Sequence, residues 1–168
     1  LGRPAEHSYR GELWEKSASF HLLVCKRAAE RSANRDAVAA LDRGLECLRH
    51  LPNDAAQQRL AVDLRLTAMA ALLPLGERER ILELLSEARD IAEVLGDSRK
   101  LAAIHSQLPL AFWMKGLHNS ALDSAQRALA TAESGDALPR TLAARYAIGL
   151  VHHARAVRKH NLNAGILG

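Results

Sequence analysis

The amino-acid sequence predicts an all-α protein, an antiparallel helix-pair solenoid of about 7–8 helices. Of its 168 residues, 48% are hydrophobic but only 4% are aromatic, so aliphatic side chains must fill the core. Runs of Ala, Leu, Arg and Glu dominate, and these residues lose little conformational entropy in a helix. Apolar residues recur every three or four positions, and one segment repeats after about 40 residues, as in stacked helix pairs.

The repeat is clearest in the middle of the chain. The segment Leu72–Asp97 aligns with Trp113–Asp136, so that Gly76 pairs with Gly116, 40 residues later (116 − 76). Glycine can enter a left-handed helix C-cap without steric strain. Each of these two segments also closes on Gly-Asp, at 96–97 and 135–136, where the second helix of the pair should end.

Weaker copies extend the repeat in both directions. An earlier copy places Ser32 at the glycine position, 44 residues before Gly76 (76 − 32), and a partial copy begins at Leu138. We therefore predict a single helical-repeat domain over residues 1–168. Its units are expected at about 12–51, 55–95, 98–134 and 138–168, the last of them incomplete.

Helix boundaries follow from turn residues and apolar spacing. Asn34 is a candidate N-cap for the helix that follows it, and Pro109 predicts a bend within its helix. Pro74 lies in the last turn before Gly76. The predicted helices cover about 4–10, 12–31, 35–51, 55–75, 77–95, 98–115, 117–134 and 138–158.

Composition indicates which kinds of partner and which cellular compartment to expect. The net charge is +4, but 19 acidic residues are interleaved with the Lys and Arg residues, which argues against a nucleic-acid partner. Cys25 and Cys47 are expected to be buried small hydrophobes in a reducing cytoplasm. No signal peptide or long apolar run is present, so we expect no membrane partner. A start at Leu1 without Met and an end at Gly168 suggest part of a longer protein.

No arrangement of residues points to catalysis. No two histidines are four residues apart, and the adjacent His152 and His153 point about 100° apart on a helix, so no metal site is expected. Neither a GxSxG elbow nor a GxxxxGK[ST] phosphate loop occurs. The carboxylates between Glu77 and Asp90 alternate with arginines, which is typical of a solvated, salt-bridged helix face. We predict no catalytic residue, metal or cofactor, and no enzymatic activity for this chain itself.

The pattern of small, aromatic and glycine positions resembles tetratricopeptide repeats, which implies a right-handed solenoid. The resemblance is closer to the repeats of large bacterial signalling proteins, in which a class III adenylate or guanylate cyclase domain and a P-loop ATPase precede the repeats. It implies that any catalysis lies before Leu1 in the parent protein. Similar repeats occur in large ATPase-containing transcriptional activators. The residues that carry the narrower resemblance are Leu13-Trp14-Glu15-Lys16, Arg31-Ser32-Ala33-Asn34-Arg35 and Leu73-Pro74-Leu75-Gly76-Glu77.

The resemblance also implies a binding surface. In such solenoids the first helix of each pair lines the concave side, and a protein or peptide, or another domain of the same chain, could bind there. Trp113 and Tyr146 would be the aromatic anchors, unless they belong to the core between helices. A small-molecule sensor and a self-associating homo-oligomer remain alternatives. The predicted strip consists of Leu66, Ala70, Leu73, Ser106, Leu110, Trp113, Tyr146, Leu150 and His153.

Overall fold

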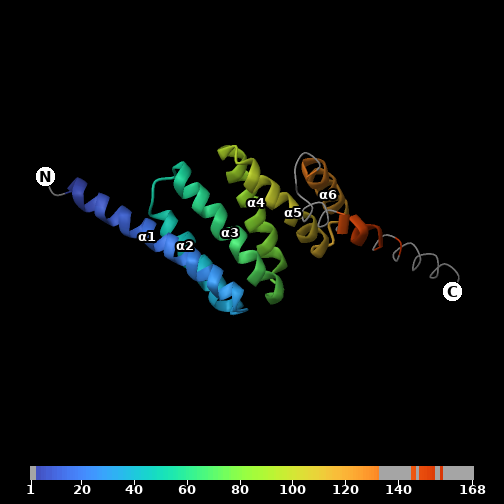
Figure 1. Cartoon of the computed structure of the whole chain (residues 1–168), viewed down its shortest axis with the longest axis horizontal. Coiled ribbons are helices and arrows are strands. Elements are labelled where there is room, and N and C mark those ends of the chain that lie inside the picture. Colours follow the sequence, from blue (N-terminus) through green and yellow to red (C-terminus); the bar gives the residue numbers. More distant parts are fainter. Residues whose placement is uncertain (1–2, 133–144, 147, 154–155, 157–168) are drawn as a thin grey trace. The chain divides into compact units, whose positions relative to one another are not determined.

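The computed structural model describes residues 3–132, 145–146, 148–153 and 156, and within them it is all-α (Figure 1). No strand occurs among these residues, so the predicted fold class is confirmed at this level. None of the described helices has the length and apolar character that crossing a membrane requires. The helices are α1 (Arg3–Glu30), α2 (Asn34–Arg49), α3 (Ala55–Leu75), α4 (Arg78–Leu95), α5 (Ser98–Met114) and α6 (His118–Ala132).

Two predictions at the N-terminal end of the chain were wrong. A break was expected between residues 10 and 12, but α1 runs through Gly11 without interruption. Glycine weakens a helix by about 1 kcal/mol relative to alanine, yet it keeps its N–H donor and does not by itself end one. Asn34 is not the N-cap of α2. Ala33 takes that position, and no side-chain hydrogen bond caps the helix.

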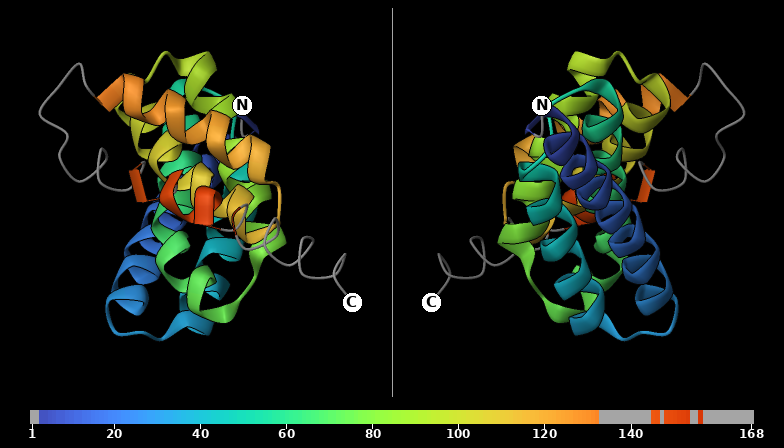
Figure 2. Two further views of the ribbon diagram at one scale, coloured as in Figure 1. Left: turned by 90° about the vertical axis from the view of Figure 1, so that its right-hand side faces the viewer. Right: turned by 90° about the vertical axis from the view of Figure 1, so that its left-hand side faces the viewer.

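The chain divides into two compact units, Leu1–Lys100 and Leu101–Gly168. In the first unit α1 packs with α2 and α3 packs with α4, and both α1 and α2 also pack against α3 (Figures 1 and 2). Large aliphatic side chains fill this core, among them the fully buried Leu41, Leu64, Leu72 and Leu85. Small residues such as Ala18, Ala37 and Ala68 lie between them and are fully buried too.

The second unit shows the same apolar spacing. In α5 the buried residues are Ile104, Leu108, Pro109 and Ala111, and the helix continues through Pro109. In α6 the buried alanines Ala121, Ala125 and Ala128 recur every three or four residues. The predicted Gly135-Asp136 helix end and most of the predicted helix 138–158 lie outside the described residues, although 148–153 are helical.

The same left-handed turn ends α1, α3, α4 and α5. The four residues with positive φ among those described are Ser32 (57°), Gly76 (71°), Gly96 (63°) and Gly116 (74°). In each turn the next residue's N–H bonds back five residues, as from Glu77 N to Leu72 O at 3.3 Å. These are Schellman C-caps, which satisfy carbonyls that the helix end leaves free. The predicted left-handed caps at Gly76 and Gly116, and the equivalence of Ser32 with glycine, are confirmed.

Asp97 starts the next helix, as the sequence indicated. Its Oδ1 accepts a hydrogen bond from the backbone N–H of Lys100 at 3.0 Å. The same kind of cap opens α3, where Oδ1 of Asp54 accepts from Ala56 N at 2.8 Å and Gln57 N at 3.1 Å. Both carboxylates satisfy free N–H groups of a first helical turn.

Gly44 is the point of closest approach in the first unit. A Cβ atom at this position would lie 2.9 Å from Cδ2 of Leu64 on α3 and 3.3 Å from Cβ of His21 on α1. Glycine therefore allows α1, α2 and α3 to meet, because helices approach closely only where the crossing has little side-chain bulk. His21 lies at this crossing, and burial, followed by the nearby Arg43 charge, lowers the pKa of its imidazole.

The left-handed turns give a first prediction. Ser32→Gly should raise the free energy of unfolding by about 1 kcal/mol, because it removes the strain of a Cβ at positive φ. The matched change Gly76→Ser should lower it by about as much, and chemical denaturation of both variants measures the two effects. A loss of stability in Ser32→Gly would contradict the assigned backbone conformation.

The crossing at Gly44 gives a second prediction. Gly44→Ala should reduce the free energy of unfolding by about 1 kcal/mol, since overpacking against the buried Leu64 outweighs alanine's better helix propensity. In a Leu64→Val background, which shortens the opposing side chain, the same substitution should be neutral or stabilising. Equal losses in the two backgrounds, measured by urea denaturation, would show that the Leu64 contact is not the cause.

Candidate functional site

A groove of about 680 Å³ lies in the first unit, with α2 and α4 as its two edges and α3 as its floor. The connection between α2 and α3 closes one part of it. The groove exists because α2 and α4 each pack against α3 and are held apart by it (Figure 1). Its lining consists of Asp42, Leu45, Glu46, Leu48, Arg49, Leu51, Pro52, Asn53, Gln57, Gln58, Ala61, Arg65, Arg80, Leu84, Glu87 and Ile91.

Each edge of the groove carries apolar residues among its charged ones. On α2 and just after it, Leu45, Leu48 and Leu51 recur every three residues, and all three are half-buried. On α4, Leu84 and Ile91 are seven residues apart, two helical turns, and so lie on one face. Ala61 contributes the small side chain on the floor. A partner could therefore bury apolar groups against both edges at once.

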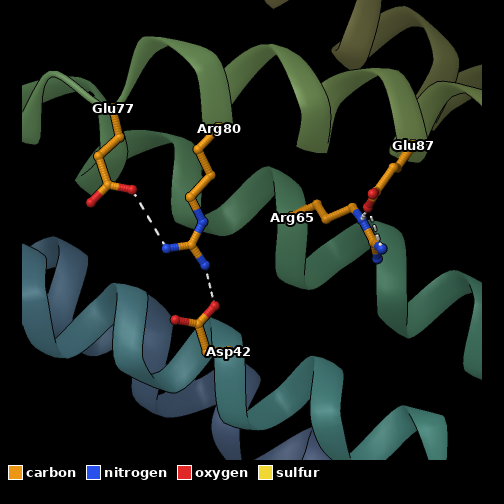
Figure 3. Close-up of polar contacts among 5 residues, drawn as sticks. All are labelled: Asp42, Arg65, Glu77, Arg80 and Glu87. Atoms are coloured by element: carbon orange, nitrogen blue, oxygen red, sulfur yellow. Dashed lines mark hydrogen bonds and ion pairs between the residues drawn. The ribbon is translucent and has the colours of Figure 1, made fainter.

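Arg80 joins the two edges. Its Nη2 donates to Oδ1 of Asp42 on α2, and its Nη1 lies 3.5 Å from Oε2 of Glu77 (Figure 3). The Arg80 side chain is 31% exposed, so solvent only partly screens these pairs. The ion pair to Asp42 bridges 38 positions of sequence and links α2 to α4 at this level.

Arg65 makes a second, more buried link between helices. Its Nε and Nη2 donate to Oε2 of Glu87 at 3.0 and 2.7 Å (Figure 3). Its Nη1 donates to the Ala61 carbonyl at 3.0 Å. The guanidinium group is thereby held on the floor by its own helix and at the edge by α4. The side chain of Arg65 is only 13% exposed, while that of Glu87 is 56% exposed.

The charges of the lining balance. Asp42, Glu46 and Glu87 face Arg49, Arg65 and Arg80, which leaves the groove with no net formal charge. Arg49 pairs with Glu46 on its own helix at 3.0 Å. The amides of Asn53, Gln57 and Gln58 add neutral hydrogen-bonding groups, and Gln58 Nε2 donates to Asn53 Oδ1 at 3.2 Å. The groove is thus amphipathic and electrically neutral.

The described residues offer little for bond-making chemistry. Among them, no group of three or more His, Cys, Asp or Glu side chains is placed to hold a metal ion. Cys25 and Cys47 are free and buried, as the sequence indicated, and burial raises the pKa of the Cys25 thiol. Cys47 Sγ lies 3.4 Å from Ser17 Oγ, and neither cysteine lines the groove.

The predicted strip is spread over both units. In the first unit, Leu66 is half-buried, Ala70 is exposed and Leu73 is 46% exposed. Its other six members are in the second unit, where Tyr146 is 66% exposed, His153 is exposed and Leu150 is half-buried. Ser106, Leu110 and Trp113 of α5 are half-buried, and Nε1 of Trp113 is buried without a hydrogen-bond partner. That these residues form one surface remains a prediction.

None of the residues of the predicted strip lines the groove. The strip was placed on the first helix of each pair, whereas the groove lies mostly between two second helices, α2 and α4. A partial signal was Leu45, which lies beside the buried face of Ala37, Leu41 and Gly44 and widens the apolar stripe of α2.

No family model, curated protein or solved structure matches the chain. The resemblance to tetratricopeptide repeats of cyclase-linked proteins therefore stays a prediction, and the groove must be interpreted from its own geometry.

The ion pair on the groove floor gives a third prediction. Glu87→Gln should lower the free energy of unfolding by about 1 kcal/mol, because it leaves the poorly exposed Arg65 guanidinium with a weaker partner. Glu83→Gln, one turn earlier on α4 and exposed, is the matched control and should change stability by less than about 0.5 kcal/mol. Adding about 1 M salt should shrink the difference between the variants, as charge screening requires. Identical stabilities at low salt would contradict this account.

Proposed function

We propose that this chain is a non-catalytic helical interaction module, with the groove between α2 and α4 as its binding site. The observation that supports this best is the groove itself, which has apolar residues along both edges and ion pairs between the helices that form it. The half-buried leucines 45, 48 and 51 on one side and the half-buried Ile91 on the other offer apolar area to a partner, which is the main favourable term in association. The ion pairs keep the site open without a ligand, so binding requires little reorganisation.

The partner best suited to the groove is a short amphipathic helix. The α2 edge from Asp42 to Arg49 extends about 11 Å at the rise of an α-helix, which accommodates about two helical turns of a partner. Apolar side chains at i, i+3 or i+4 and i+7 would contact Leu45, Leu48 and Leu51 on one edge and Leu84 and Ile91 on the other. Because the lining has no net charge, a partner without a strong net charge is favoured.

A fourth prediction tests the site with two matched substitutions on α3. Helical peptides of about 15 residues, selected from a displayed library on the full chain, provide the probes. Ala61→Trp fills the groove floor and should weaken their binding at least tenfold, measured by fluorescence anisotropy. Ala70→Trp places the same side chain in the predicted strip and should leave binding unchanged. If Ala70→Trp weakened binding and Ala61→Trp did not, the predicted strip would be the binding site. If the library yielded no binders, the result would count against an interaction module.

A small-molecule sensor is the second candidate. A volume of about 680 Å³ lies within the range of small-molecule sites, and the amides at 53, 57 and 58 could orient a polar ligand. Thermal-shift screening with metabolites separates the candidates. A compound that raises the melting temperature of the native chain, but not of Ala61→Trp, would favour the sensor over the peptide-binding module.

The resemblance of the repeat residues supports a further proposal about the parent protein. It would be a cytoplasmic bacterial signalling protein, a cyclase or, as the alternative, an ATPase-containing transcriptional regulator, with this chain as its regulatory module. An antibody against the chain should then capture a native protein with a mass several-fold above 18.3 kDa that converts ATP to cyclic AMP. A mass near that of the chain without activity would contradict the link to cyclases.

A further inference from the structure

The outward face of α1 carries apolar residues that no described helix covers. Leu13 is 49% exposed, Phe20 is 61% exposed and Leu23 is 43% exposed, and their spacing of seven and three residues places them on one stripe. In the right-hand view of Figure 2, α1 lies at the front of the first unit. The outermost helix of a stack normally presents a polar face to water, so an apolar stripe on α1 needs a physical explanation.

The internal repeat identifies the matching face of α3. Ser32 and Gly76 end α1 and α3 with the same left-handed cap, so positions 44 apart are equivalent (76 − 32). Two equivalent pairs, Ala18 with Val62 and Cys25 with Met69, are buried in both helices. Three other pairs differ. Leu64 on α3 is fully buried, whereas its equivalent Phe20 on α1 is exposed. Ala68 and Ala71 are also fully buried, whereas their equivalents Val24 and Arg27 are half-buried and exposed, respectively.

The structure also shows what covers this face on α3. Both α1 and α2 pack against α3, and Gly44 of α2 lies directly over Leu64. We propose that the stripe of Leu13, Phe20, Leu23 and Val24 on α1 is the stacking surface for one more helix pair of the same construction in the same polypeptide. That pair would place a small residue over Phe20, as Gly44 lies over Leu64. This inference is independent of the groove.

Two cationic positions beside the stripe specify the partner further. Arg27 stands where α3 has the buried Ala71, and Lys16 stands where it has Leu60. Long cationic side chains can cover apolar surface with their methylene groups while the charge reaches the edge. Lys16 already lies 3.7 Å from Glu12 on α1. The stacked pair is therefore expected to carry an acidic residue near Arg27.

The fifth prediction uses the chain's own helix pair as the probe. A tandem chain of residues 1–54 followed by 11–168 keeps every residue and inserts one extra unit. At its junction Asp54 is followed by Gly11, which is equivalent to Ala55 because the two are 44 positions apart. The two copies therefore have the same spacing as α1 and α3. The upstream α1–α2 pair can then stack on the downstream α1. The melting temperature should rise by about 5 °C or more above that of the native chain, because the downstream stripe becomes buried.

The tandem chain contains its own control. Phe20→Glu in the downstream copy should remove most of the rise, whereas Phe20→Glu in the upstream copy, where the side chain stays exposed, should shift the melting temperature by less than about 2 °C. Arg27→Ala in the downstream copy should increase the rise further. Equal effects of Phe20→Glu in both copies, or no rise at all, would overturn the proposal. The native chain should be monomeric in light scattering, and a dimer that Phe20→Glu dissociates would assign the stripe to a second copy.

Discussion

Within each helix pair of the first unit, α1–α2 and α3–α4, the chain reverses in the same way. A residue in the left-handed conformation ends a helix, and the following N–H bonds back to a carbonyl five residues earlier. This cap satisfies carbonyls at the helix end and sends the chain back along its own helix, so that the next helix packs antiparallel to it. Ser32 performs the same task as Gly76, Gly96 and Gly116 in spite of its Cβ. The helix pairs, their spacing and the equivalence of α1 with α3 all follow from this turn.

The second constraint is the position of α3 among its neighbours. Gly44 removes the side chain that would otherwise keep α2 away from Leu64, and α1 and α2 then both pack against α3. Because α4 packs on another part of α3, a groove remains between α2 and α4. Arg80 and Arg65 hold the edges of this groove through Asp42 and Glu87, which are 38 and 22 positions away from their partners in the sequence.

The first unit therefore presents two surfaces with different chemistry. The groove has no net formal charge and contains ion pairs between its helices. The α1 stripe is apolar and flanked by Lys16 and Arg27, and Leu64 and Ala68, the α3 counterparts of Phe20 and Val24, are fully buried. A module that stacks through one surface and binds through the other would couple assembly with recognition, because both surfaces are built on helices that meet at Gly44.

The sequence by itself determined the local structure. Glycine or serine at equivalent positions, aspartate at helix starts and apolar residues every three or four positions fix where helices begin and end, since these signals act through hydrogen bonds within a few residues. Even so, the continuity of α1 through Gly11 was missed, because one weak helix former does not outweigh its neighbours. Only the tertiary structure decided which faces are covered. The packing of whole helices decides how closely α2 approaches α3 at Gly44, how far α2 lies from α4, and that Arg65 pairs with Glu87. Contacts of this kind join segments that are far apart in the sequence, so they leave no periodic signal in it.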